Sequence, residues 1–309
     1  MNKKIVYGLV IAVVIALIAY GVQVILSPNV QKEESVATLR IVASIYPLAD
    51  VAKNIAGNRA VISTVTPAGT EPHDYEPTAR DITEVYDADL FLFNGNGVDT
   101  WAEKIQGEME GADKEVIRMA DHVESLKNPE KEESSAYDPH FWLDPINVAT
   151  EAKLITETLK RIDPAGSAYY NERNLQYQDR LTKLDQLYRD RLAHCEQREI
   201  ITSHNAFNYL AKRYNLTTFF IAISPEEEPS PRDLAETAKI AKQKKISHIF
   251  FETLVSPKLS QTIASEVGVK TLELNPIEGF TDEQIASGRD YISQMESNLT
   301  NLTTALQCR

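Results

Sequence analysis

The chain has 309 residues, of which 43% are apolar and 25% charged, which is typical of a globular protein large enough for two ordinary domains. Its formal net charge is −13, and it contains no long run of Lys or Arg. Nucleic-acid binding requires basic surface that neutralises phosphates, so the composition argues against a nucleic-acid partner.

The N-terminal segment predicts a link to a membrane. Lys3 and Lys4 precede an uncharged stretch over residues 5–26, which as a helix would extend about 33 Å, enough to cross a bilayer. A cleaved signal peptide is the alternative, but the stretch is long for one, and we favour an uncleaved anchor. No cysteine follows it that could be lipid-modified. In either case the two lysines place the rest of the chain outside the cytoplasm.

An alternation of strands and helices follows a polar tether that ends at residue 38. Short β-rich runs, separated by helix-compatible segments, are Leu39–Tyr46, Val61–Thr66, Leu90–Asn94 and Glu115–Met119. This order predicts a parallel sheet with helices on its faces. The polar, acidic stretch 121–138 has no periodicity and predicts a loop.

Two consecutive helices are predicted in the middle of the chain. Asp144 and Asn147 are candidate caps of the first. Asp163 and Pro164 separate it from the second, which extends to residue 193 and is longer than a small α/β layer needs. We therefore expect the second helix to connect two parts of the molecule.

The second half repeats the pattern of the first. Its strand-like runs are Glu199–Ser203, Thr217–Ile223, Ile246–Glu252 and Lys270–Leu274. The predicted fold class is α/β: two βα-rich domains, each with a mainly parallel four-stranded sheet, joined by one long rigid helix. The expected divisions are an anchor and tether (1–38), a first lobe (39–163), a linking helix (164–193) and a second lobe (194–309).

The chain has two cysteines, Cys195 and Cys308. In an oxidising compartment they predict one disulfide that closes a loop of more than a hundred residues. Two free buried thiols, or two metal ligands, remain alternatives, although there is no CxxC pair.

Four candidate metal ligands occur where open α/β sheets place their ligands, after strands or in connecting loops. Imidazole and carboxylate are ordinary ligands of zinc and other first-row divalent metals. Two candidates in each half would form one tetrahedral site between the lobes. The set is His73, His140, His204 and Glu278.

Several stretches together resemble the solute-binding proteins of zinc and manganese ABC importers, over roughly residues 39–308. They are IVASIYPLADVAKNIAG, PAGTEPHDYEPTARD, DPHFWLDPIN, ITSHNAFNYLAKRY, SPEEEPSPRDL, FFETLVSP and LNPIEGFTDE. The resemblance implies two α/β domains bridged by a long helix with the metal between them, and it assigns the ligand positions to His73, His140, His204 and Glu278. It further implies a monomer that delivers its ion to a membrane permease served by a cytoplasmic ATPase.

The ligand set favours zinc, because three nitrogens and one carboxylate are softer than the oxygen-rich sets that suit manganese. A manganese- or iron-binding importer component is the alternative. A zinc hydrolase is a further one, but Glu278 as the fourth ligand would close the coordination position that catalysis needs, and we expect no enzyme. Asp74 and Asn205 are candidate hydrogen-bond partners of the histidines, and we expect Trp142 to be a packing residue.

Overall fold

The computed structural model describes residues 38–110, 114–128, 135–222, 230–254 and 256–309. Residues 38–309 form a compact unit of their own. The expected membrane segment 5–26 and its tether up to residue 37 lie outside the described residues. Among the helices that are described, none combines the length and apolar character needed to cross a membrane.

The first half contains a four-stranded parallel sheet with the strand order β2-β1-β3-β4. Its strands are fully or partly buried and rich in β-branched or aromatic residues, as a sheet covered on both faces requires. They are β1 (Leu39–Ala43), β2 (Ala60–Thr64), β3 (Leu90–Phe93) and β4 (Glu115–Arg118). All four lie within the predicted runs or within one residue of them.

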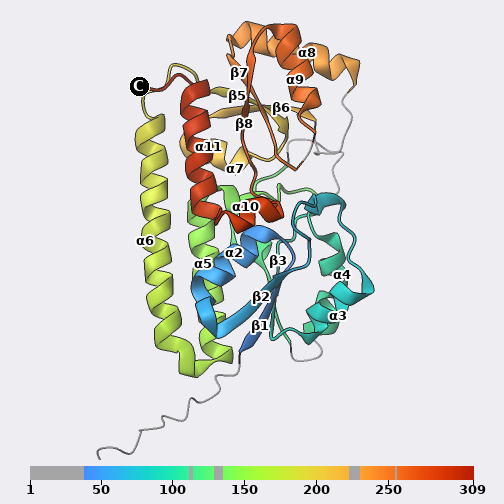
Figure 1. Cartoon of the computed structure of the whole chain (residues 1–309), viewed down its shortest axis with the longest axis vertical. Helices are drawn as coiled ribbons and strands as arrows, with labels where there is room; N and C mark the ends of the chain where they lie inside the picture. Colours follow the sequence, from blue (N-terminus) through green and yellow to red (C-terminus); the bar gives the residue numbers. More distant parts are fainter. Residues whose placement is uncertain (1–37, 111–113, 129–134, 223–229, 255) are drawn as a thin grey trace, which may run out of the picture. The chain divides into compact units, whose positions relative to one another are not determined.

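The two faces of this sheet pack against different helices. In β3, Leu90 and Leu92 belong to the large core that contains α2 (Tyr46–Ala56), whereas Phe91 and Phe93 belong to a smaller cluster with α3 (Ala79–Asp87) and α4 (Thr100–Glu110). Because successive side chains of a strand point to opposite faces, this division confirms a sheet covered on both sides (Figure 1).

The second half contains four parallel strands in two hydrogen-bonded pairs, β5–β6 and β7–β8. They are β5 (Glu199–His204), β6 (Thr217–Ala222), β7 (His248–Phe251) and β8 (Lys270–Glu273). The α/β fold class is confirmed, but the expected continuous four-stranded ladder is replaced by these pairs. The carboxyl ends of β5 and β7 are joined through side chains instead, since the Ser203 hydroxyl donates to Glu252.

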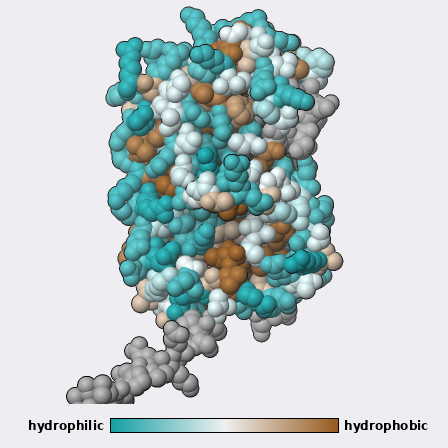
Figure 2. Space-filling model, in the orientation of Figure 1, coloured by the Kyte–Doolittle hydropathy of each residue, from teal (hydrophilic) through white to brown (hydrophobic). Residues whose placement is uncertain are grey.

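Short helices surround and follow the strands of this half. They are α7 (Asn208–Tyr214), α8 (Pro231–Lys244), α9 (Lys258–Val267) and α10 (Asp282–Ala286). The surface seen in Figure 2 is mostly hydrophilic, with apolar groups scattered over it, as expected for a surface that faces water.

The long helix α6 (Ser167–Leu192) runs along the molecule with two other helices beside it, α5 (Pro145–Ile162) next to the first half and α11 (Tyr291–Ala305) next to the second (Figure 1). The 26 residues of α6 extend about 39 Å at the usual helical rise. Arg173 of α6 donates to the carbonyl of Asn54 on α2 at 2.7 Å, and the Tyr188 hydroxyl donates to the carbonyl of Met295 on α11 at 2.6 Å. The long helix therefore contacts elements of both halves.

Local chemistry explains two further features of these helices. The Asp144 side chain accepts from the backbone N–H of Ile146 and caps α5, whereas Asn147 lies inside the helix and donates to the carbonyl of Phe141. Asp144 is thus the cap, and the prediction for Asn147 was wrong because Pro145 already occupies the first helical turn. Cys195, just after α6, forms a disulfide with Cys308, just after α11.

Candidate metal centre

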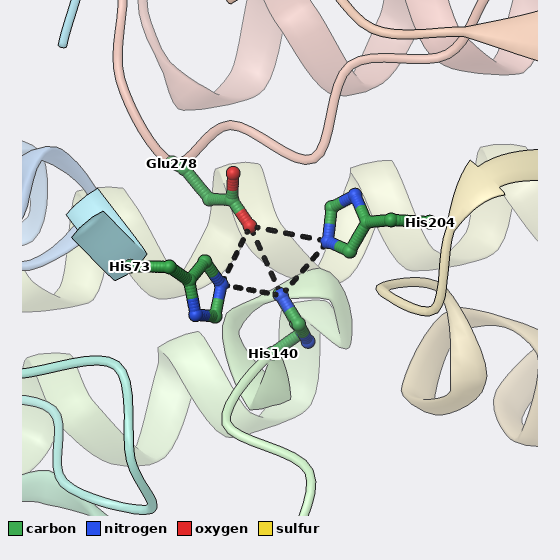
Figure 3. A group of neighbouring side chains, drawn as sticks. All are labelled: His73, His140, His204 and Glu278. Atoms are coloured by element: carbon green, nitrogen blue, oxygen red, sulfur yellow. Dashed lines mark hydrogen bonds and ion pairs between the residues drawn. The ribbon is translucent and has the colours of Figure 1, made fainter. Parts of the chain in front are cut away.

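The four predicted ligands converge on one point, although they come from four separate segments (Figure 3). His73 lies in a short 3₁₀ turn after β2, and His140 directly precedes another such turn. His204 is the last residue of β5, and Glu278 follows β8. The placement agrees with the rule that parallel strands of an α/β fold gather ligands at their carboxyl ends.

The ligand atoms lie at the separations that a small cation requires. Nε2 of His140 is 3.3 Å from Nε2 of His73, 3.3 Å from Nε2 of His204 and 3.0 Å from Oε1 of Glu278. The same Glu278 oxygen is 3.4 Å from Nε2 of His73 and 3.5 Å from Nε2 of His204. All four atoms lie within 4.8 Å of one another.

These distances fit a tetrahedral zinc ion. With bonds of about 2.0–2.1 Å, neighbouring ligand atoms of a tetrahedron are about 3.3–3.4 Å apart. The five pairs with a measured separation fall between 3.0 and 3.5 Å. The residues present therefore match zinc both in ligand type and in spacing.

The outer nitrogens of two histidines are bound to carboxylates. Nδ1 of His140 is 2.8 Å from Oδ1 of Asp138, and Nδ1 of His204 is 2.7 Å from Oε1 of Glu252. Because an ionised carboxylate only accepts hydrogen bonds, each Nδ1 bears the proton and each Nε2 directs its lone pair toward the centre. Nitrogen lone pairs that face one another and Glu278 need a cation between them.

The pKa values show the same preference for positive charge. Burial alone would lower the pKa of His140, but hydrogen bonds to Asp138 and Glu278 raise it to about 9. Burial likewise opposes the charged form of His204, yet the charge of Glu252 and its hydrogen bonds raise this pKa well above the usual range. Burial would raise the pKa of Glu278, but hydrogen bonds to the three histidines hold it well below that of an ordinary glutamate. The shifts of all three groups therefore favour positive charge beside Glu278.

The site is closed on most sides. His140, His204 and Glu278 are buried, whereas the His73 side chain is 20% exposed. Glu71, two residues before His73, is buried, and its Oε1 accepts from the backbone N–H of His73. Burial, together with the charge of Glu278, raises the pKa of Glu71 to about 10. His73 is the solvent-facing member of the set.

Sequence reasoning identified the four central residues but missed their partners. Asp138 and Glu252 hold the imidazoles, whereas the predicted partner Asn205 donates to Asn128. Both missed residues had a signal, because Asp138 lies two positions before His140 and Glu252 directly follows β7. Trp142 is fully buried, as predicted, and its ring centroid lies 5.3 Å from that of His140.

Comparisons with known proteins agree with this geometry. A family model described as "Zinc-uptake complex component A periplasmic" (ZnuA) matches residues 41–305. The high-affinity zinc uptake system protein ZnuA of Bacillus subtilis (strain 168) is 38% identical over 279 residues, which are 87% of this chain and 88% of that protein.

The zinc-binding lipoprotein AdcA of Streptococcus pneumoniae (strain ATCC BAA-255 / R6) is 34% identical over 275 residues, 85% of this chain but only 55% of AdcA. The chain thus spans about half the length of that relative. The crystal structure of the Zn(II)-bound ZnuA-like domain of S. pneumoniae AdcA has a TM-score of 0.77 and 35% identity, covering 87% of this chain and 99% of that one. The chain therefore belongs to the ZnuA family of periplasmic zinc-uptake components.

Proposed function

We propose that this chain is the extracytoplasmic zinc-binding component of an ABC metal importer. His73, His140, His204 and Glu278 bind one zinc ion, and the protein delivers that ion to a membrane permease whose cytoplasmic ATPase drives uptake. Membership of the family supports the transport role. Relatives with 38% and 34% identity are named for zinc uptake and zinc binding.

The observation that supports this proposal most strongly is the convergence of three imidazole nitrogens and one carboxylate oxygen at tetrahedral spacing. Two of the imidazoles are already fixed by Asp138 and Glu252 with Nε2 toward the centre. A site whose ligands are held in place before the ion arrives binds with little reorganisation, which favours high affinity.

Zinc suits this ligand set better than manganese does. Three of the four ligand atoms are imidazole nitrogens, whereas manganese favours sites with more oxygen. The proposed cargo is therefore zinc. Manganese or iron is the alternative, and a competition experiment distinguishes it from zinc.

The geometry favours binding over hydrolysis. A catalytic zinc needs an open coordination position and a general base beside it. Glu278, the only carboxylate with a described atom within 3.5 Å of the three ligand nitrogens, completes the set as fourth ligand.

The proposed location and division of the chain follow from this role. We place residues 38–309 outside the cytoplasm, as a disulfide suggests, attached to the membrane or secreted according to the fate of residues 5–26. Residues 39–163 and 194–309 would be the two lobes and residues 164–193 the linking helix. The long helix favours small movements of loops at the site over wide closure of the lobes.

Metal analysis tests the proposal. Residues 38–309, which form a compact unit, are purified without added metal, analysed for bound metals and titrated with zinc and manganese against a chromophoric chelator. One tightly bound zinc per chain, which manganese does not displace, is expected. A preference for manganese would show that the cargo is manganese and not zinc, and the absence of any stoichiometric metal would refute the proposal.

A further inference from the structure

The segment that bears Glu278 has an unusual backbone. Ile277, the preceding residue, has φ of +63°. A β-branched residue rarely adopts this left-handed conformation, because its side chain crowds the backbone. Ile277 is also fully buried. Such a conformation persists only where the surroundings impose it.

The surroundings that impose it begin at Asn275. The backbone N–H of Asn275 donates to Oδ1 of Asn298 at 3.0 Å, and Nδ2 of Asn298 donates back to the Asn275 carbonyl at 2.7 Å. The Asn275 side chain then accepts from the backbone N–H of Ile277 at 2.6 Å. Asn298 thus holds the base of the turn, and the turn directs the next residue, Glu278, into the site.

The Asn298 amide is itself fixed. Gln294, one turn earlier on α11, donates to Oδ1 of Asn298 at 3.0 Å, and Arg289 donates to Oε1 of Gln294 at 2.6 Å. On the other side of the segment, the Trp142 indole donates to the carbonyl of Pro276 at 2.7 Å. Asn298, Gln294 and Trp142 are all fully buried. Hydrogen bonds in such a dry environment fix geometry strongly.

We propose that Asn298 is a positioning residue for the metal site, which holds the strained turn at Ile277 and thereby keeps the Glu278 carboxylate facing the three histidines. The proposal rests on the function proposed above. Without the two hydrogen bonds from Asn298, the turn relaxes toward an ordinary backbone conformation, and the carboxylate moves away from the position at which Oε1 is 3.0 Å from His140.

A double-mutant cycle tests this role. Zinc affinity is measured by chelator competition for the wild type, Asn298→Ala, Glu278→Ala and the double variant. Asn301→Ala is the matched control, because Asn301 lies on the same helix and also donates to a backbone carbonyl, that of Glu273 at 2.8 Å, outside the turn. Circular dichroism checks that each protein is folded.

We expect Asn298→Ala to weaken zinc binding about tenfold to a hundredfold when Glu278 is present, and by no more than about twofold in the Glu278→Ala background. Asn301→Ala should leave zinc affinity unchanged both with Glu278 present and in the Glu278→Ala background. Equal weakening in both backgrounds would show that Asn298 acts on the fold in general and would overturn the proposal, as would wild-type affinity in folded Asn298→Ala.

A second variant covers the case in which Asn298→Ala does not fold. Ile277→Gly allows the positive φ without strain and releases the turn toward other conformations. It should weaken zinc binding only while Glu278 is present, and an equal loss in both backgrounds would again refute the positioning role. Failure of the wild type to bind zinc would refute the proposed function instead, so the two failures are distinguishable.

Discussion

Oε1 of Glu252 accepts a hydrogen bond from Nδ1 of His204 at 2.7 Å, on the opposite side of the imidazole ring from the proposed metal position. Both side chains are almost fully buried. The carboxylate therefore fixes the ring orientation and keeps the Nε2 lone pair directed at the other ligands.

Removing the charge of Glu252 should weaken metal binding without removing a ligand. Glu252→Gln is expected to lower zinc affinity about tenfold to a hundredfold, because an amide can present its NH₂ group to Nδ1 and favour the wrong tautomer. Competition with a chromophoric chelator measures the effect. Ser203→Ala is the control, since it removes a second donor to Glu252 but leaves His204 paired; a larger loss in the control than in Glu252→Gln would contradict this account.

The central position of His140 predicts an order of effects among the ligands. His140→Ala should lower zinc affinity by several orders of magnitude, because its Nε2 lies within 3.3 Å of the other three ligand atoms. Glu278→Ala should cost less, because water can replace a carboxylate oxygen. The same titration, with circular dichroism to check folding, compares the two. Wild-type affinity in the His140 variant would remove this residue from the site.

The sequence pattern was sufficient to locate the strands, and the resemblance to a known family assigned the four central residues. Each strand run is short, apolar and bounded by turns, so Leu90–Asn94 could be identified as a strand without knowing its neighbours. His73, His204 and Glu278 lie after strands or at the end of one, and α/β folds place their ligands at the carboxyl ends of parallel strands. That rule holds for any sheet of this type and needs no detailed geometry.

Residues whose role depends on neighbours far along the chain could not be predicted. Glu252 and His204 are 48 positions apart, and their contact exists only because β5 and β7 end side by side. The strained conformation of Ile277 contradicts its local preference, which favours extended backbone. It is imposed by Asn298, 23 positions after Asn275. Tertiary contacts decide such details, and propensities do not.

The disulfide should stabilise the fold considerably. Cys195 and Cys308 are 113 positions apart, and closing a loop of this length in the unfolded chain contributes up to about 5 kcal/mol in the chain-entropy description. The double variant Cys195→Ser, Cys308→Ser should lose about 2–5 kcal/mol of unfolding free energy, measured by urea denaturation without reductant. Reduced wild type should match the variant. Equal unfolding free energies of the oxidised wild type and the variant would show that the disulfide does not stabilise the protein by restricting the conformations of the unfolded chain.

Glu151, a buried carboxyl of α5, predicts a specific pH dependence of stability. Both of its oxygens lack a hydrogen-bond partner among the described residues, and burial raises its pKa to about 8. Tyr177 and Tyr291, which interact with it electrostatically, stay protonated below pH 8, since burial raises the pKa of both well above the usual range.

Between pH 5 and pH 8 the unfolded chain has therefore released a proton that folded Glu151 retains, so stability falls as pH rises, by about 1.4 kcal/mol per pH unit. Glu151→Gln removes this contribution. In the absence of metal, the unfolding free energy of the variant minus that of the wild type should increase as the pH rises from 5.5 to 7.5. Glu157→Gln, at an exposed position of the same helix, is the control. Parallel pH curves for Glu151→Gln and wild type would refute the assignment.

The four central residues come from segments spread between positions 73 and 278, so neither half of the chain contains the whole site. A bound ion raises the free energy of unfolding by about 4 kcal/mol when its concentration is a thousand times the dissociation constant. It therefore penalises opening of either half alone, because either opening separates ligands. Proteases cleave opened chains, so metal-loaded molecules should survive digestion that destroys metal-free ones. Every molecule that holds the ion at this site is therefore one in which both halves are folded.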